Sequence, residues 1–136
     1  MKSLSFLAIL GTVLISCGVA TPNKQDTLKE SVLLFNEGVR WGRLQDVLPR
    51  VAPEHADNFI EMHKDFGKTI QISDYELINT KANWEDKQAV VTVQITWYRN
   101  TEMELHTTIL SQKWEQVGVD WVMMAESFVS GEPFLQ

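Results

Sequence analysis

Residues 89–98 read Ala-Val-Val-Thr-Val-Gln-Ile-Thr-Trp-Tyr. Apolar side chains occupy every odd position from Ala89 to Trp97, whereas threonine and glutamine occupy most of the even positions. Successive side chains of a β-strand point to opposite faces, so this alternation predicts a long strand with one buried face.

The segments on both sides of this strand extend the pattern. Residues 99–102 predict a turn, 103–116 a returning strand, 117–120 a second turn and 121–129 a last strand. Upstream, alternation begins at Thr69 and slips by one residue at Ser73-Asp74, where we expect a bulge or kink. A polar turn over 84–88 joins that strand to residues 89–98. The pattern predicts an antiparallel meander.

Helical spacing precedes the strands. Thr27 and Glu30 have the form of a capping box, and the apolar positions that follow predict a helix over residues 28–41. A short helical turn at 44–48 and a third helix from Pro53, ended by Gly67, follow. Helices followed by antiparallel strands predict an α+β fold in which the helices pack on one face of a curved sheet.

This order of elements, the hairpin with Ile95-Thr96-Trp97-Tyr98, and the closing segment Gln112-Lys113-Trp114-Glu115, Gly118, Trp121-Val122 resemble the cone-shaped superfamily of nuclear transport factor 2, ketosteroid isomerase and the polyketide cyclases. The resemblance covers residues 27–129 and implies a single domain over residues 27–136. It carries over no catalytic signature. The superfamily contains enzymes and partner-binding modules, so the resemblance alone selects neither function.

Composition excludes several classes of protein. The chain has 136 residues, 12 Lys+Arg against 18 Asp+Glu, and a formal charge of -6. A nucleic-acid surface needs clustered basic residues, and the sequence has no such cluster. Cys17 is the single cysteine, which rules out an intramolecular disulfide and a cysteine-based metal site. We expect neither a cofactor nor a bound metal.

An apolar run over residues 4–15 follows Lys2 and predicts a signal peptide over residues 1–16. The run ends in Leu14-Ile15-Ser16-Cys17, which resembles the lipobox of bacterial lipoproteins. The resemblance implies a diacylglycerol on the Cys17 thiol and cleavage before Cys17, with residues 17–26 as lipidated cysteine and tether. The alternative is an ordinary signal peptide and a core cysteine. Gly18, where an aspartate would resemble an inner-membrane retention signal, favours the outer membrane.

Pairing Trp97 with Glu104, Ile95 with His106 and Gln112 with Ala125 defines the two sheet faces. The concave face then contains the candidate pocket, which consists of Trp97, Glu104, His106, Gln112 and Trp114. His106 with Glu104 and Tyr98 is the one constellation that resembles acid/base machinery. We favour a hydrogen-bonded structural histidine over a catalytic one, and we assign no catalytic residue.

The opposite face is unusually apolar for a solvated surface. It forms a candidate interface of Met103, Leu105, Ile109, Val122, Met124 and Phe128. We expect a homodimer or an envelope protein partner there, unless residues 131–136 fold back and cover part of it. The preferred function is therefore a non-catalytic, lipid-anchored envelope module for protein–protein interaction. The alternative is a pocket that binds or isomerises a small apolar ligand.

Overall fold

The computed structural model describes residues 17–18 and 20–134. Its helical part contains α1 (Lys24–Arg40), α2 (Leu44–Val47), the 3₁₀ turns η1 (Leu48–Arg50) and η2 (Pro53–His55), and α3 (Ala56–His63). Its sheet contains β1 (Ile70–Asn83), β2 (Gln88–Arg99), β3 (His106–Val117) and β4 (Asp120–Gly131). The predicted signal peptide lies outside the described residues. Among those described, no helix is long and apolar enough to cross a membrane.

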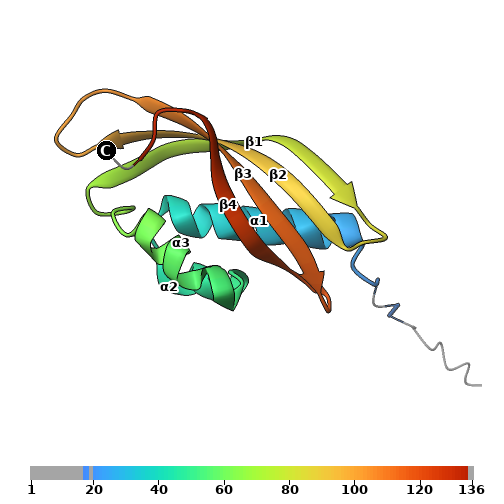
Figure 1. Cartoon of the computed structure of the whole chain (residues 1–136). Helices are drawn as coiled ribbons and strands as arrows, with labels where there is room; N and C mark the ends of the chain where they lie inside the picture. Colours follow the sequence, from blue (N-terminus) through green and yellow to red (C-terminus); the bar gives the residue numbers. More distant parts are fainter. Residues whose placement is uncertain (1–16, 19, 135–136) are drawn as a thin grey trace, which may run out of the picture.

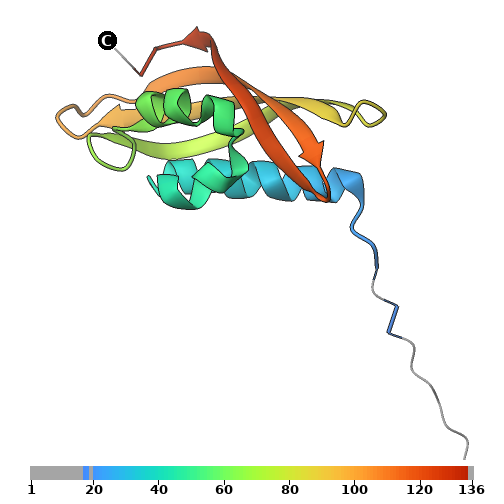
Figure 2. The ribbon, with the colours of Figure 1, turned by 60° about the horizontal axis from the view of Figure 1, so that its bottom comes forward.

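The four strands form one antiparallel sheet in the order β1-β2-β3-β4. Figure 1 shows this sheet curving over α1, and Figure 2 shows α2 and α3 on the same side of the sheet. The predicted α+β architecture, with helices on one face of a curved antiparallel sheet, is confirmed.

The core lies between α1 and the concave face of the sheet. The apolar stripe of α1 is buried, and Phe35 at its centre packs edge-on against Trp114, with ring centroids 5.3 Å apart. Phe59 of α3 contacts the same phenylalanine at 5.6 Å. On β2, the odd positions from Ala89 to Trp97 are all buried, as the alternation predicts.

The first helix begins earlier than the predicted range of 28–41. Asn23 caps α1 by accepting a hydrogen bond from the backbone amide of Gln25 at 3.2 Å. Thr27 therefore lies inside the first turn, where its hydroxyl donates to the Lys24 carbonyl at 3.0 Å, and the predicted capping box does not form. The segment before α1 is correspondingly shorter than the predicted tether of residues 17–26.

Two strand registers differ from the predicted ones. Trp97 pairs with His106 rather than with Glu104, because residues 100–105 form a longer connection. A shift of two residues leaves each side chain on its predicted face. The expected irregularity in β1 is confirmed between Ile72 and Asp74. A further bulge at Lys113/Trp114 reverses the phase of β4 after Met124, and a second shift at Ile109/Leu110 reverses it again.

The predicted outer-face patch does not form one surface. Met103 and Leu105 lie in the exposed connection between β2 and β3. Phe128 pairs with the buried Leu110 because of the bulge, and cross-strand partners share a face. Ile109, Val122 and Met124 are half-buried members of β3 and β4 that keep their predicted phase.

Candidate functional site

The structure divides the five predicted pocket residues among three places. Trp97 and His106 lie in contact near the end of the sheet where β2 meets β3. Gln112 and Trp114 are buried in the middle of β3. Glu104 lies in the exposed 100–105 connection, and the carboxylates that bond His106 belong to Glu102 and Glu132 instead. The predicted pocket is therefore not one site.

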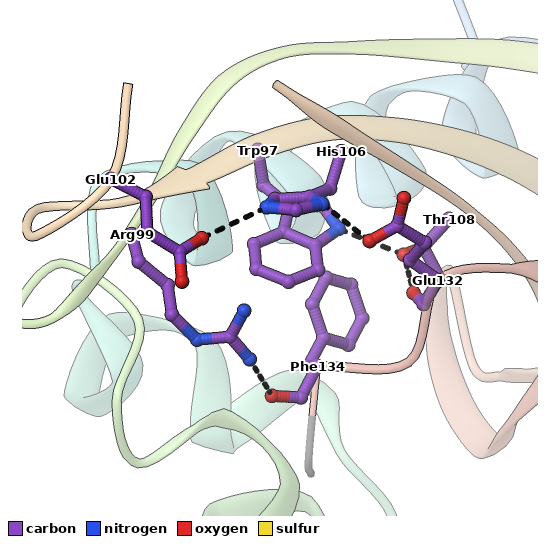
Figure 3. Close-up of polar contacts among 7 residues, drawn as sticks. All are labelled: Trp97, Arg99, Glu102, His106, Thr108, Glu132 and Phe134. Carbon is purple, nitrogen blue, oxygen red and sulfur yellow. Dashed lines mark hydrogen bonds and ion pairs between the residues drawn. The ribbon is translucent and has the colours of Figure 1, made fainter. Parts of the chain in front are cut away.

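His106 is held between two carboxylates (Figure 3). Its Nε2 lies 3.1 Å from Oε2 of Glu102, and its Nδ1 bonds Oε2 of Glu132. A carboxylate only accepts, so both ring nitrogens donate when the imidazole is protonated. Hydrogen bonding to Glu102, followed by hydrogen bonding and charge from Glu132 and the charge of the predicted neighbour Glu104, raises the pKa of His106 above 6.5, although burial opposes the shift.

The C-terminal segment closes the core beside this histidine. Gly131, with a φ of 90°, allows the chain to turn after β4, and the next amide, that of Glu132, donates to the Thr107 carbonyl at 2.9 Å. Phe134 then packs against Trp97 with ring centroids 5.2 Å apart, and Figure 3 shows the two rings together. Residues 131–134 therefore enter the core instead of covering the outer face, and residues 135–136 lie outside the described residues.

Polar contacts fix this closure. Arg99 donates to the Phe134 carbonyl at 3.0 Å and lies 4.8 Å from the centre of the Trp97 ring. The Trp97 indole donates to the Thr108 hydroxyl at 2.8 Å, and that hydroxyl donates to the Glu132 carbonyl (Figure 3). We name His106, Glu102, Glu132, Arg99 and Thr108 the end cluster.

A second polar cluster lies inside the core. Gln112 and Asn36 exchange amide hydrogen bonds of 2.9 and 3.2 Å. The Gln112 amide also donates to Oε2 of Glu126 at 2.7 Å, and Oε1 of Glu126 lies 2.8 Å from Nε2 of His63. We name Asn36, His63, Gln112 and Glu126 the core cluster. Their exposed fractions are at most 4 %, counted on the side chain for Glu126.

The tautomer of His63 follows from its other contact. Its Nδ1 lies 2.8 Å from the Phe59 carbonyl, which can only accept, so Nδ1 holds a hydrogen. The Nε2–Oε1 approach to Glu126 is close but poorly aligned for a hydrogen bond, and we treat it as a short polar contact. An imidazole beside a carboxylate is acid/base chemistry in principle.

The space beside that pair is small. A cavity of about 40 Å³ lies against His63 and Glu126, with Met62, Met123 and Ala125 among its walls. Pockets for small molecules span roughly 300–1,000 Å³, so this cavity suits one or two waters rather than a substrate. Aromatic rings of Phe35, Phe59 and Trp114 occupy the adjoining interior.

A larger groove of about 490 Å³ lies between the first turns of α1 and the β1–β2 hairpin. Its apolar lining residues are Leu28, Val32, Leu77, Ala82, Trp84 and Val91, and its polar ones are Gln25, Lys29 and Thr80. No part of the predicted pocket belongs to this groove.

Sequence reasoning missed much of the core cluster for identifiable reasons. Asn36 is four residues after Val32 and three before Val39, so helical spacing already placed it on the buried stripe. His63 lies on the apolar stripe predicted for the third helix. No pattern in the sequence marked Glu126 as buried, because the bulge that turns its side chain inward depends on how β4 pairs with β3. Within residues 17–18 and 20–134, no three histidine, cysteine, aspartate or glutamate side chains are placed so that they could hold a metal ion together.

Comparisons with known proteins indicate the fold only. A scan against family models gives no match, and a search of curated proteins gives none either. An NTF2-like protein from Cytophaga hutchinsonii is 11% identical with a TM-score of 0.61, covering 80% of this chain and 99% of its own. A putative Ca/calmodulin-dependent kinase II association domain from Exiguobacterium sibiricum is 11% identical with a TM-score of 0.66, covering 85% and 99%.

A ketosteroid isomerase-like protein from Erwinia carotovora atroseptica is also 11% identical, with a TM-score of 0.56 and coverage of 76% and 95%. Proteins this distant in sequence share an architecture, and an architecture does not define an activity. The chain has the α+β, nuclear-transport-factor-2-like fold.

Proposed function

We propose that the protein is a lipid-anchored lipoprotein of the bacterial envelope, in the outer membrane, whose NTF2-like domain is a non-catalytic module for protein–protein interaction. The lipobox resemblance at Leu14-Ile15-Ser16-Cys17 supports the anchor. Cys17 is exposed, seven residues before the first residue of α1, which is compatible with an anchor outside the folded domain.

The small volume beside the buried His63–Glu126 pair is the observation that carries the non-catalytic part of the proposal. Catalysis by the His63–Glu126 pair requires a substrate within hydrogen-bond reach of the proton that moves. The adjoining cavity of about 40 Å³ is too small for one, and Phe134 closes the core beside Trp97. Both ring nitrogens of His106 bond to carboxylates, those of Glu102 and Glu132, so we interpret His106 as a residue that holds the C-terminal segment in place.

The partner surface that we favour is the 100–105 connection, and the outer sheet face is a separate, second candidate contact. Leu105 is 63% exposed and Met103 is fully exposed, whereas connections are ordinarily polar. Ile109 and Met124 add half-buried apolar surface on the sheet. The occupant is an envelope protein or a second copy of this chain.

The groove of about 490 Å³ supports a second candidate function, the binding of a small apolar ligand. Its size falls within the range of ligand pockets, and most of its walls are apolar. This candidate replaces the predicted pocket of Trp97, His106 and Trp114. Trp97 packs against His106 and Phe134, whereas Trp114 packs separately against Phe35.

The anchor is tested by mass spectrometry of the full chain produced in bacteria. We expect a mature form that starts at Cys17 with added acyl mass, and we expect Cys17→Ser to leave the membrane fraction. A mature form cleaved elsewhere with a free thiol would contradict the anchor.

The module is tested by photo-crosslinking in native membranes from Leu105. We expect one discrete adduct, with a second copy or another envelope protein, and none from the matched exposed position Glu85 at the opposite end. Equal labelling from both positions contradicts the proposed surface. Turnover of an apolar ligand that His63→Gln abolishes would contradict the non-catalytic assignment.

A further inference from the structure

We propose that the end of the domain at which α1 begins lies against the lipid bilayer, with the tips of the two hairpins, Trp84, Val117 and Val119, in the membrane interface. This inference rests on the lipid anchor proposed at Cys17. It adds an orientation and a second contact with the membrane, made by the folded domain itself.

Three segments distant in sequence meet at this end. Figures 1 and 2 both place the start of α1, the β1–β2 turn and the β3–β4 turn at the same end of the molecule. The Trp121 indole at the start of β4 donates to the Thr27 hydroxyl of α1 at 3.3 Å. The same indole lies edge-on to Trp84 of the β1–β2 turn, with ring centroids 6.1 Å apart.

Apolar side chains are exposed at both hairpin tips. Val117 and Val119 are 62% and 71% exposed on either side of Gly118, whose φ of 67° forms the turn. Trp84 is 38% exposed. Turns are ordinarily built from polar residues, glycine and proline, so two valines and a tryptophan at neighbouring tips call for a non-aqueous contact.

The exposed tryptophan is continuous with the groove. Trp84 is one wall of the groove, and Leu28 and Leu77 are among the others. Apolar surface therefore extends from the tip of the β1–β2 hairpin towards α1. Tryptophan is favoured at membrane–water interfaces because its ring is apolar and its N–H remains able to bond.

The length of chain between the anchor and the helix selects the bilayer as the occupant. Lys24 lies seven residues after Cys17, and a fully extended chain over that separation spans about 24 Å. With its 17 residues, α1 is itself about 25 Å long. A lipid on Cys17 therefore keeps the start of α1 within about 24 Å of the headgroups. Contact through the hairpin tips would then place Trp41, at the other end of the helix, away from them.

Charge at this end indicates how the contact forms. Lys29 of α1 and Lys87 of the β1–β2 turn lie among acidic neighbours, including Glu30, Glu85 and Asp86. Because the signs are mixed, there is no basic surface for anionic lipids. The contact depends on apolar and aromatic side chains, so it needs no anionic lipid and resists added salt.

Quenching of tryptophan fluorescence tests the contact. The acylated chain, purified from bacterial membranes, is reconstituted in phosphatidylcholine vesicles with and without spin-labelled lipid close to the headgroups. We expect quenching in the wild type, loss of at least half of it in Trp84→Phe, and no loss in Trp41→Phe. Trp41 is the matched control because it is 60% exposed at the opposite end of α1.

The outcomes are decisive in both directions. Equal quenching in Trp84→Phe and the wild type, or loss of quenching in Trp41→Phe, overturns the orientation. The double variant Val117→Ser/Val119→Ser changes only exposed positions at the tip of the β3–β4 hairpin, and we expect at least a twofold fall in quenching. An unchanged signal overturns the tip contact. Replacing half of the lipid with phosphatidylglycerol should change nothing, and a strong dependence on it overturns the apolar mechanism.

Vesicle flotation of the same samples separates this inference from the anchor. Protein that does not float lacks the anchor, and both proposals fail together. Protein that floats without quenching that depends on Trp84 keeps its anchor and refutes the orientation alone.

Discussion

Replacement of Gln112 by leucine removes the amide that connects the core cluster while nearly conserving side-chain volume. Gln112 is fully buried and makes three hydrogen bonds, two with Asn36 and one with Glu126. In the variant, Asn36 Oδ1 and Glu126 Oε2 lose their donor, whereas Asn36 Nδ2 keeps the Val32 carbonyl at 2.8 Å. The packing between α1, β3 and β4 is otherwise unchanged.

The expected cost follows from the two orphaned acceptors. A buried acceptor without a partner costs about 1–3 kcal/mol, and a charged one costs more. Their sum is about 3–5 kcal/mol, from which the extra apolar burial of leucine subtracts about 1 kcal/mol. We expect Gln112→Leu to lower the free energy of unfolding by about 3 kcal/mol, equivalent to a melting temperature about 10 °C lower for a domain of this size.

Urea unfolding followed by far-ultraviolet circular dichroism measures this loss. The matched control is Gln94→Leu, a half-buried glutamine on the outer face of the same sheet, for which we expect a change within about 0.5 kcal/mol. The double variant Asn36→Leu/Gln112→Leu should lose less free energy of unfolding than the sum of the two single variants, because the Asn36 Oδ1 acceptor that lacks a donor in Gln112→Leu is no longer present. If Gln112→Leu lowers the free energy of unfolding by less than about 1 kcal/mol, or by the same amount as Gln94→Leu, the core cluster does not stabilise the fold as we infer.

Three further expectations concern the closed end and the outer face. Because the folded pKa of His106 is raised above 6.5, the contribution of its protonated form to the free energy of unfolding is complete below pH 6.5 and is lost as the pH rises through the folded pKa. The urea midpoint should therefore fall over that pH window. A fall of equal size in His106→Gln would contradict this assignment. Phe134→Ala should cost about 2–3 kcal/mol in the same assay, less than a central phenylalanine because the terminal segment can adjust, and no loss relative to the exposed Pro133→Ala would contradict the closure. Ile109→Lys/Met124→Lys should convert a dimer to a folded monomer in analytical ultracentrifugation, and a wild type that stays monomeric at tens of micromolar rules out self-association.

Local periodicity predicted which strand faces are buried. The alternation from Ala89 to Trp97 matches the burial of β2 residue by residue, because a strand with one packed face has a side-chain period of two. The irregularity at Ser73 was also visible, since it breaks that period within a single strand. Both features belong to one segment and need no knowledge of its neighbours.

The composition of the candidate site depended on pairing between segments, which the sequence does not show directly. Glu104 was predicted beside His106, whereas the longer 100–105 connection and the turn at Gly131 bring Glu102 and Glu132 to it instead. Glu126 reaches Gln112 only because one extra residue of β4 is accommodated by the bulge. Loop length and bulges are set by tertiary packing, so these errors share one physical origin.

The arrangement of the domain along α1 gives its two ends different surroundings. A short tether holds the first turn of the helix near the membrane if Cys17 is acylated, and 17 residues of helix extend about 25 Å from there. The connection with Met103 and Leu105 lies at the far end in Figures 1 and 2. In the proposed orientation, a partner that binds Met103 and Leu105 would approach free of the headgroups, whereas Trp84, Val117 and Val119 would face them.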